Sequence, residues 1–135
     1  MKSIICLIVA AITLILGFLG CSSTDEKGLL QGNVLIGPII PVEQLGQDTT
    51  LRCDIYDERK IMIYDKNSTK LLKQVDIECN VEENYTRYRV ELEPGIYTVD
   101  INYIGIDHSY DVPKQVEIIS GTTFKLDIEI DTGIR

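Results

Sequence analysis

The stretch over residues 92–99, Leu-Glu-Pro-Gly-Ile-Tyr-Thr-Val, constrains the fold more than any other part of the chain. Apolar and polar residues alternate with a period of two on both sides of it, over 88–92 and over 97–103. This period indicates strands with one buried face and one face in water. Pro94 and Gly95 are preferred at the two central positions of a type II turn. The sequence therefore predicts a strand, a tight turn and a second strand.

The rest of the exported chain shows the same short alternation and no sustained helical period. Five further strands are expected, over 30–36, 60–65, 71–79, 116–118 and 124–130. About seven short strands at close spacing predict an all-β fold, a single seven-stranded antiparallel β-sandwich.

The N-terminus has a different pattern from the strands. Residues 4–19 are almost purely apolar, and Lys2 is the only charged residue before them. About 16 apolar residues is short for a transmembrane helix, which needs roughly 20. A charged start, a short apolar stretch and small residues at its end indicate a secretory signal peptide.

The end of that stretch, Phe-Leu-Gly-Cys over 18–21, resembles a prokaryotic lipobox. The resemblance implies cleavage before Cys21 and attachment of diacylglycerol to its sulfur, although Phe18 differs from the usual Leu. An ordinary cleaved signal or an uncleaved anchor helix is the alternative. The expected organisation is a lipoprotein signal peptide over 1–20, a lipidated tether over 21–28 and a β-sandwich domain over 29–135. We expect a lipid-anchored protein on the extracytoplasmic face of the cell membrane, or of an outer membrane if the cell has one.

The exported chain is strongly acidic. All 21 acidic residues remain after cleavage, as do 12 of the 13 basic ones, so the net charge becomes −9. This charge argues against a nucleic-acid partner and against electrostatic binding to anionic lipid. We therefore expect the lipid anchor, and not the protein surface, to hold the domain at the membrane.

The motif Leu-x-Pro-Gly-x-Tyr-x-Val over 92–99 resembles the hairpin of carboxypeptidase regulatory-like domains, which share a transthyretin-like (prealbumin-like) seven-stranded sandwich. The beginning (32–42) and the end (131–135) of the domain resemble small secreted or lipidated prokaryotic proteins that carry it. The chain departs from the pattern over 79–85, where a short Asp-x-x-Gly turn is usual. The resemblance implies a non-catalytic accessory or binding module and names no ligand.

Cys53 and Cys79 are the only cysteines of the exported domain besides Cys21. A pair in an oxidising compartment suggests a disulfide. It would close a loop of about 27 residues and contribute roughly 3 kcal/mol. Two separate buried thiols, or reduced thiols in an anaerobe, are the alternatives.

The longest irregular stretch runs from Glu43 to about Glu58, and long loops of this kind often carry function. With the proline-containing segment before it, it forms a candidate contact loop over 38–58. Two prolines, Pro38 and Pro41, exclude a central strand at its start. We expect this loop to contact another envelope protein, a glycan or a peptide. The candidate contact residues are Pro38, Pro41, Asp54, Asp57 and Glu58. The same carboxylates, or Glu82 and Glu83, could instead hold Ca²⁺, although no EF-hand spacing is present.

His108 is the only histidine, and Asp107 and Asp111 lie near it in the sequence. A metal or acid–base cluster is conceivable, but a single histidine without a cysteine pattern argues against zinc. A solvated loop is the simpler interpretation. Because no nucleophile motif or phosphate-binding glycine loop is present, we expect no enzyme and no cofactor. A small hydrolase with His108 as its base is the alternative.

Overall fold

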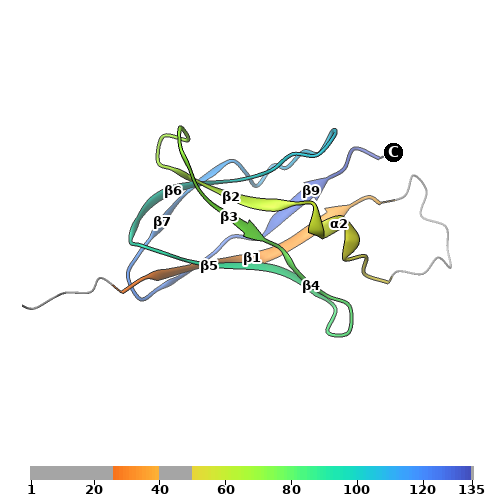
Figure 1. Ribbon diagram of the computed structural model, residues 1–135, viewed down its shortest axis with the longest axis horizontal. Helices are drawn as coiled ribbons and strands as arrows, with labels where there is room; N and C mark the ends of the chain where they lie inside the picture. Colours follow the sequence, from red (N-terminus) through yellow and green to blue (C-terminus); the bar gives the residue numbers. More distant parts are fainter. Residues whose placement is uncertain (1–25, 40–49, 135) are drawn as a thin grey trace, which may run out of the picture.

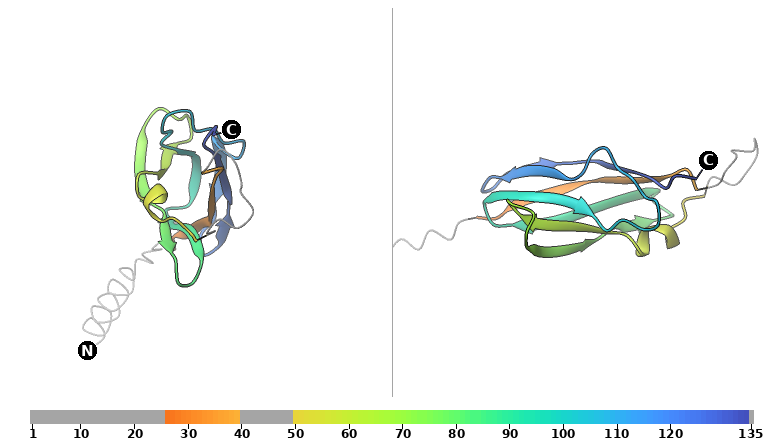
Figure 2. Two further views of the ribbon diagram at one scale, coloured as in Figure 1. Left: turned by 90° about the vertical axis from the view of Figure 1, so that its right-hand side faces the viewer. Right: turned by 90° about the horizontal axis from the view of Figure 1, so that it is seen from above.

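The computed structural model describes residues 26–39 and 50–134, which form a β-sandwich of two facing sheets (Figures 1 and 2). The elements, in chain order, are β1 (Gly28–Gly37), α2 (Asp54–Asp57), β2 (Lys60–Asp65), β3 (Leu71–Asp76), β4 (Glu78–Asn80), β5 (Tyr85–Leu92), β6 (Gly95–Ile101), β7 (Lys114–Ile118), β8 (Thr123–Lys125) and β9 (Ile128–Asp131). The predicted all-β sandwich is confirmed. The described residues form nine strands, however, where seven were expected.

One sheet has the strand order β4-β5-β1-β8. β9 also pairs with β1, along the part of β1 that follows its pairing with β8. The other sheet has the order β3-β2-β6-β7. The second sheet is antiparallel throughout. In the first sheet, β8 and β9 run parallel to β1. The expectation of a wholly antiparallel sandwich is therefore wrong at this edge.

The Pro-Gly motif does not form a hairpin, which corrects the prediction from the sequence. β5 pairs with β1 and β4, whereas β6 pairs with β2 and β7. The chain bends at Pro94 and crosses from one sheet to the other. Gly95 has a φ of 158°, far from the roughly +80° of a type II turn. The alternation was correctly interpreted as two half-buried strands. It could not distinguish a hairpin from a crossing between sheets, because one face of each strand is buried in both cases.

Two other predicted strands are each broken into two shorter strands. The strand over 71–79 breaks at Ile77, so that β3 joins the second sheet and β4 the first. The strand over 124–130 breaks at Leu126 and Asp127. There the Leu126 N–H donates to the Gln31 carbonyl (2.9 Å), and the Asp127 carboxylate accepts from the Asn33 N–H (2.8 Å). These two breaks account for the two additional strands.

The core lies between the sheets and consists of the inward positions of the strands. Its most deeply buried side chains are Leu30, Val34, Ile61, Ile63, Tyr88, Val99, Ile128 and Ile130. Cys53 and Cys79 form a disulfide with a Cα–Cα distance of 5.5 Å, so this prediction is confirmed. The bond ties the residue before α2 to β4 and so fixes the helix against the first sheet.

The predicted signal peptide, the lipid-attachment residue Cys21 and the loop residue Pro41 lie outside the described residues. Among residues 26–39 and 50–134, no helix has the length and apolar character to cross a membrane.

Candidate functional site

A pocket of about 380 Å³ opens at one end of the sandwich. It lies between the end of β1, helix α2, the connection after β6 and the C-terminal segment, which Figure 1 shows grouped together. Six isoleucines form most of its wall: Ile36, Ile39, Ile55, Ile104, Ile106 and Ile134. The first residues of β1 lie at the opposite end of the molecule (Figure 1).

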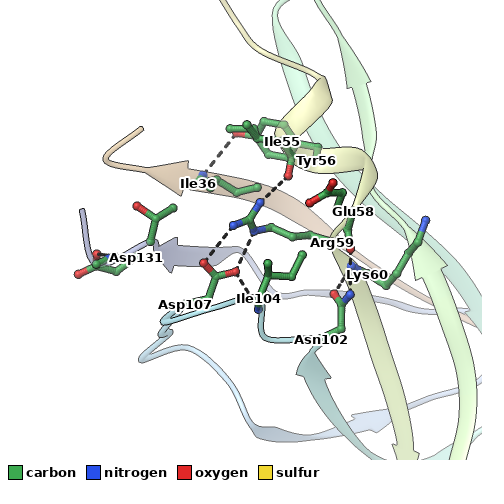
Figure 3. Close-up of polar contacts among 12 residues, drawn as sticks. Ile36, Ile55, Tyr56, Glu58, Arg59, Lys60, Asn102, Ile104, Asp107 and Asp131 are labelled. Atoms are coloured by element: carbon green, nitrogen blue, oxygen red, sulfur yellow. Dashed lines mark hydrogen bonds and ion pairs between the residues drawn. The ribbon is translucent and has the colours of Figure 1, made fainter. Parts of the chain in front are cut away.

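A buried ion pair lines the pocket. Arg59 Nε lies 2.9 Å from Asp107 Oδ2, and Arg59 Nη2 lies 3.0 Å from Asp107 Oδ1 (Figure 3). The two side chains are only 11% and 2% exposed. Such a two-pronged contact between a guanidinium and a carboxylate is stronger and more directional than a single hydrogen bond. The pair joins Arg59, two residues after α2, to the turn after β6.

Local hydrogen bonds hold both partners of this pair in place. Arg59 Nη1 donates to the Ile55 carbonyl (2.7 Å), so the guanidinium closes the end of α2. The Asp107 N–H donates to the Ile104 carbonyl (3.0 Å), and Asp107 Oδ2 accepts from the Ile104 N–H (3.3 Å). The hydrogen bonds within each segment therefore hold the Arg59 and Asp107 side chains in the positions from which they pair.

The backbone on both sides of Arg59 is fixed by Asn102. Its side-chain nitrogen donates to the Glu58 carbonyl (2.9 Å), and its side-chain oxygen accepts from the Lys60 N–H. Helix α2 is docked separately by Tyr56, which is buried and whose hydroxyl accepts from the Ile36 N–H (3.4 Å). Figure 3 shows these contacts around the guanidinium. The pocket wall is thus anchored to β1, β2 and the end of β6.

The pocket combines aliphatic walls with a guanidinium whose charge is balanced. Arg59 carries five N–H donors, of which three are used by Asp107 and Ile55. Because Asp107 neutralises the guanidinium, an additional carboxylate would gain little attraction here. The arrangement suits a branched aliphatic group next to a neutral acceptor such as a peptide carbonyl.

Of the sequence-predicted contact residues, the structure describes Pro38, Asp54, Asp57 and Glu58, and none of these four lines the pocket. Pro38 is exposed, and its carbonyl accepts from the Thr132 hydroxyl beside the pocket. Asp54 is exposed and pairs with Arg52, whose hydrogen bond is the main cause that lowers the pKa of that carboxyl. Asp57 and Glu58 are also exposed. Within its described residues, the predicted loop therefore contributes Ile39 and Ile55 to the pocket wall, and not the acids over 54–58.

The expected solvated loop around His108 is wrong for Asp107, which is buried against Arg59. His108 and Asp111 are exposed, as expected, and the His108 ring packs edge-on against Tyr110, with ring centroids 4.4 Å apart. Asp111 accepts from the Glu129 N–H (2.8 Å). The three side chains that are close in sequence therefore have different partners and do not converge on one point.

The acidic groups considered as calcium ligands do not converge either. Within the two described segments, no three His, Cys, Asp or Glu side chains are grouped so that they could hold a metal ion.

Neither Arg59 nor the isoleucines at 104, 106 and 134 were predicted from the sequence as site residues. The ion pair joins residues 48 positions apart. The apolar residues occur in irregular segments, where they have no period to mark a buried face. Only the meeting of two loops at one end of the sandwich makes them a site.

Comparison with protein-family models and with curated protein sequences found no match for this chain.

Proposed function

We propose that the chain is an extracytoplasmic lipoprotein, anchored through Cys21, whose transthyretin-like sandwich serves as a non-catalytic binding module of the cell envelope. The isoleucine-lined pocket is its binding surface.

The observation that carries this proposal is the separation of the pocket from the N-terminal end. The described chain begins at Glu26, next to β1, and the pocket lies at the other end of the sandwich (Figures 1 and 2). Glu26 is only five residues from Cys21, a span of at most about 17 Å. An anchor at Cys21 would hold the near end at the bilayer and present the pocket to the envelope.

The chemistry of the pocket favours a protein or peptide over a glycan. Its walls are aliphatic, and its polar groups are mostly engaged with one another. Sites of this kind bind apolar groups and use a few polar atoms to orient them. A glycan would present many hydroxyls that these walls cannot satisfy. We therefore propose an envelope protein that inserts a branched aliphatic side chain.

The test uses the full-length protein, a photo-crosslinking residue at Thr132 and two matched variants. Ile106→Asp places a charge in the pocket wall, whereas Val81→Asp places one at an exposed site on the turn after β4. We expect one partner to crosslink to the parent protein and to Val81→Asp, but not to Ile106→Asp. Equal crosslinking of both variants would overturn the assignment of the pocket. A mature chain that lacks lipid on Cys21 by mass spectrometry would overturn the anchoring.

A further inference from the structure

The end of the sandwich opposite the pocket has a surface that differs in charge from the rest of the domain. We call it the near end, and define it as residues 26–27, 65–72, 93–96 and 119–122. Strand register brings these segments together: Gly28 pairs with Leu92, Gly95 with Ile118, and Asp65 with Tyr97. Figure 1 shows them on the same side, where the described chain begins.

The near end exposes several large apolar side chains. They are Leu71, Leu72, Ile96 and Ile119, with exposed fractions of 38%, 44%, 39% and 56%. They come from the start of β3, the start of β6 and the turn after β7. Single exposed apolar residues need no explanation, but a group of them around one end of a domain marks an interaction surface.

The charges of the near end balance. It carries three lysines (Lys27, Lys66 and Lys70) and three acids (Glu26, Asp65 and Glu93). Lys27 pairs with Glu93 at 3.6 Å. The Asp65 carboxylate turns into its own loop, where it accepts from the N–H groups of Thr69 (2.7 Å) and Lys70 (3.0 Å). Lys66 and Lys70 form no direct ion pair within the described part of the chain, so this end has no net charge and presents two lysines beside its apolar side chains.

The pocket end also exposes large apolar side chains, among them Ile106 and Tyr110, but its charge differs from that of the near end. Its loops over 50–59, 80–84, 102–111 and 131–134 contain two arginines and eight acids. Both arginines are already paired, Arg52 with Asp54 and Arg59 with Asp107. The net charge of −9, which argues against lipid binding by the domain as a whole, is therefore concentrated far from the tether.

From these observations we infer that the near end lies directly on the bilayer surface, with Leu71, Leu72, Ile96 and Ile119 in the headgroup region. The inference rests on the lipid attachment at Cys21 proposed above. The tether of at most about 17 Å keeps the near end within reach of the headgroups. Apolar side chains gain from entering the interface, and lysines are attracted to anionic headgroups. The acidic pocket end is repelled by the same headgroups, so the domain stands upright with its pocket outward.

The absence of tryptophan from the chain allows a direct test. We would place a single tryptophan at the near end, as Ile119→Trp, or at the pocket end, as Tyr110→Trp, where the side chain is 92% exposed. The full-length lipidated variants are reconstituted into vesicles of phosphatidylglycerol and phosphatidylcholine, with or without brominated acyl chains. Fluorescence then reports the depth of each tryptophan.

We expect the Ile119→Trp fluorescence to shift to the blue and to lose most of its intensity in brominated vesicles, while the Tyr110→Trp fluorescence stays unchanged. Flotation with the vesicles but no shift for Ile119→Trp would overturn the membrane contact and leave the anchoring intact. A blue shift for Tyr110→Trp and none for Ile119→Trp would mean that the pocket end faces the bilayer, and this would also overturn the proposed membrane contact. A blue shift of the Ile119→Trp fluorescence in the absence of vesicles would indicate that the near end self-associates, and would overturn the membrane contact. Failure to float, with no lipid on Cys21, would overturn the anchoring and with it the contact that depends on it.

Discussion

Gly32 packs directly against the main-chain carbonyl of Leu126: a Cβ atom at Gly32 would lie 1.8 Å from the Leu126 oxygen. This contact occurs where β1 changes its neighbour from β8 to β9. Leu126 is the residue at which the predicted single strand over 124–130 breaks. The missing side chain at Gly32 therefore allows the edge of the first sheet to form in two segments.

The first prediction concerns this close approach. Gly32→Ala would force apart two backbone segments, and neither can yield as a flexible side chain would. We expect a loss of about 3 kcal/mol or more in the free energy of unfolding. Gly37→Ala is the matched control in the same strand, because a Cβ there meets nothing within 4 Å. Chemical denaturation of both variants checks the prediction, and equal stabilities would contradict it.

The second prediction concerns the same carbonyl, which accepts a hydrogen bond of 2.7 Å from the Tyr88 hydroxyl. Tyr88 is completely buried, and burial raises the pKa of its phenol well above the ordinary value of 10.0. Tyr88→Phe removes the donor and leaves the ring, so we expect a loss of about 1–2 kcal/mol in denaturant unfolding.

The pH dependence of the Tyr88 effect follows from that raised pKa. The stabilisation is complete below about pH 10 and is lost as the pH rises toward the pKa of the folded state, because the unfolded chain ionises first. The stability difference between the parent and Tyr88→Phe is expected to shrink in that alkaline range. A difference that grows with alkaline pH would contradict this account.

The third prediction concerns the buried ion pair of the pocket. Arg59→Met leaves the Asp107 carboxylate buried without its partner, and we expect a loss of about 3–5 kcal/mol in the free energy of unfolding. Arg52→Met removes an exposed ion pair with Asp54, and its effect on the free energy of unfolding is expected to be far smaller. The double variant Arg59→Met with Asp107→Leu should recover part of the loss, since no charge then remains buried. Thermal or urea unfolding distinguishes these outcomes, and a double variant no more stable than Arg59→Met would contradict the charge-burial explanation.

The fourth prediction concerns acid stability. The backbone N–H of Lys70, followed by the Thr69 hydroxyl, lowers the pKa of Asp65 below its ordinary value of 3.8. A carboxyl with a lowered folded-state pKa stabilises the fold above its ordinary pKa, and this stabilisation disappears as the pH falls through the folded value. Asp65→Asn is therefore expected to be less stable than the parent at neutral pH, with a difference that vanishes in acid. Unfolding curves at several pH values check this, and a difference that does not change with pH would contradict it.

Short-range features of the structure were predictable from the sequence. The alternation reported the buried face of β5 over 88–92 and that of β6 at Val99 and Ile101, because a period of two is a property of a single strand. It was wrong at Tyr103, which is exposed beyond the end of β6, and at Thr98, which is buried. The pairing of Cys53 with Cys79 followed from their number in a domain that was expected to be exported. The pairing of β5 with β1, and not with β6, could not be predicted in this way, since each sheet position is decided by contacts between segments that are distant in sequence.

The candidate site shows the same limit. Pro38 and the acids over 54–58 stood out because of residue type, but the pocket uses the apolar residues beside them and an ion pair with the loop after β6. The all-β class, the half-buried strands and the disulfide were therefore predictable, because these depend on local period and residue count. The crossing of the Pro-Gly stretch between sheets, the close approach of Gly32 to the Leu126 carbonyl and the pairing of Arg59 with Asp107 became visible only in the folded chain. Those relationships arise when two sheets pack, since packing brings together atoms that no local pattern relates.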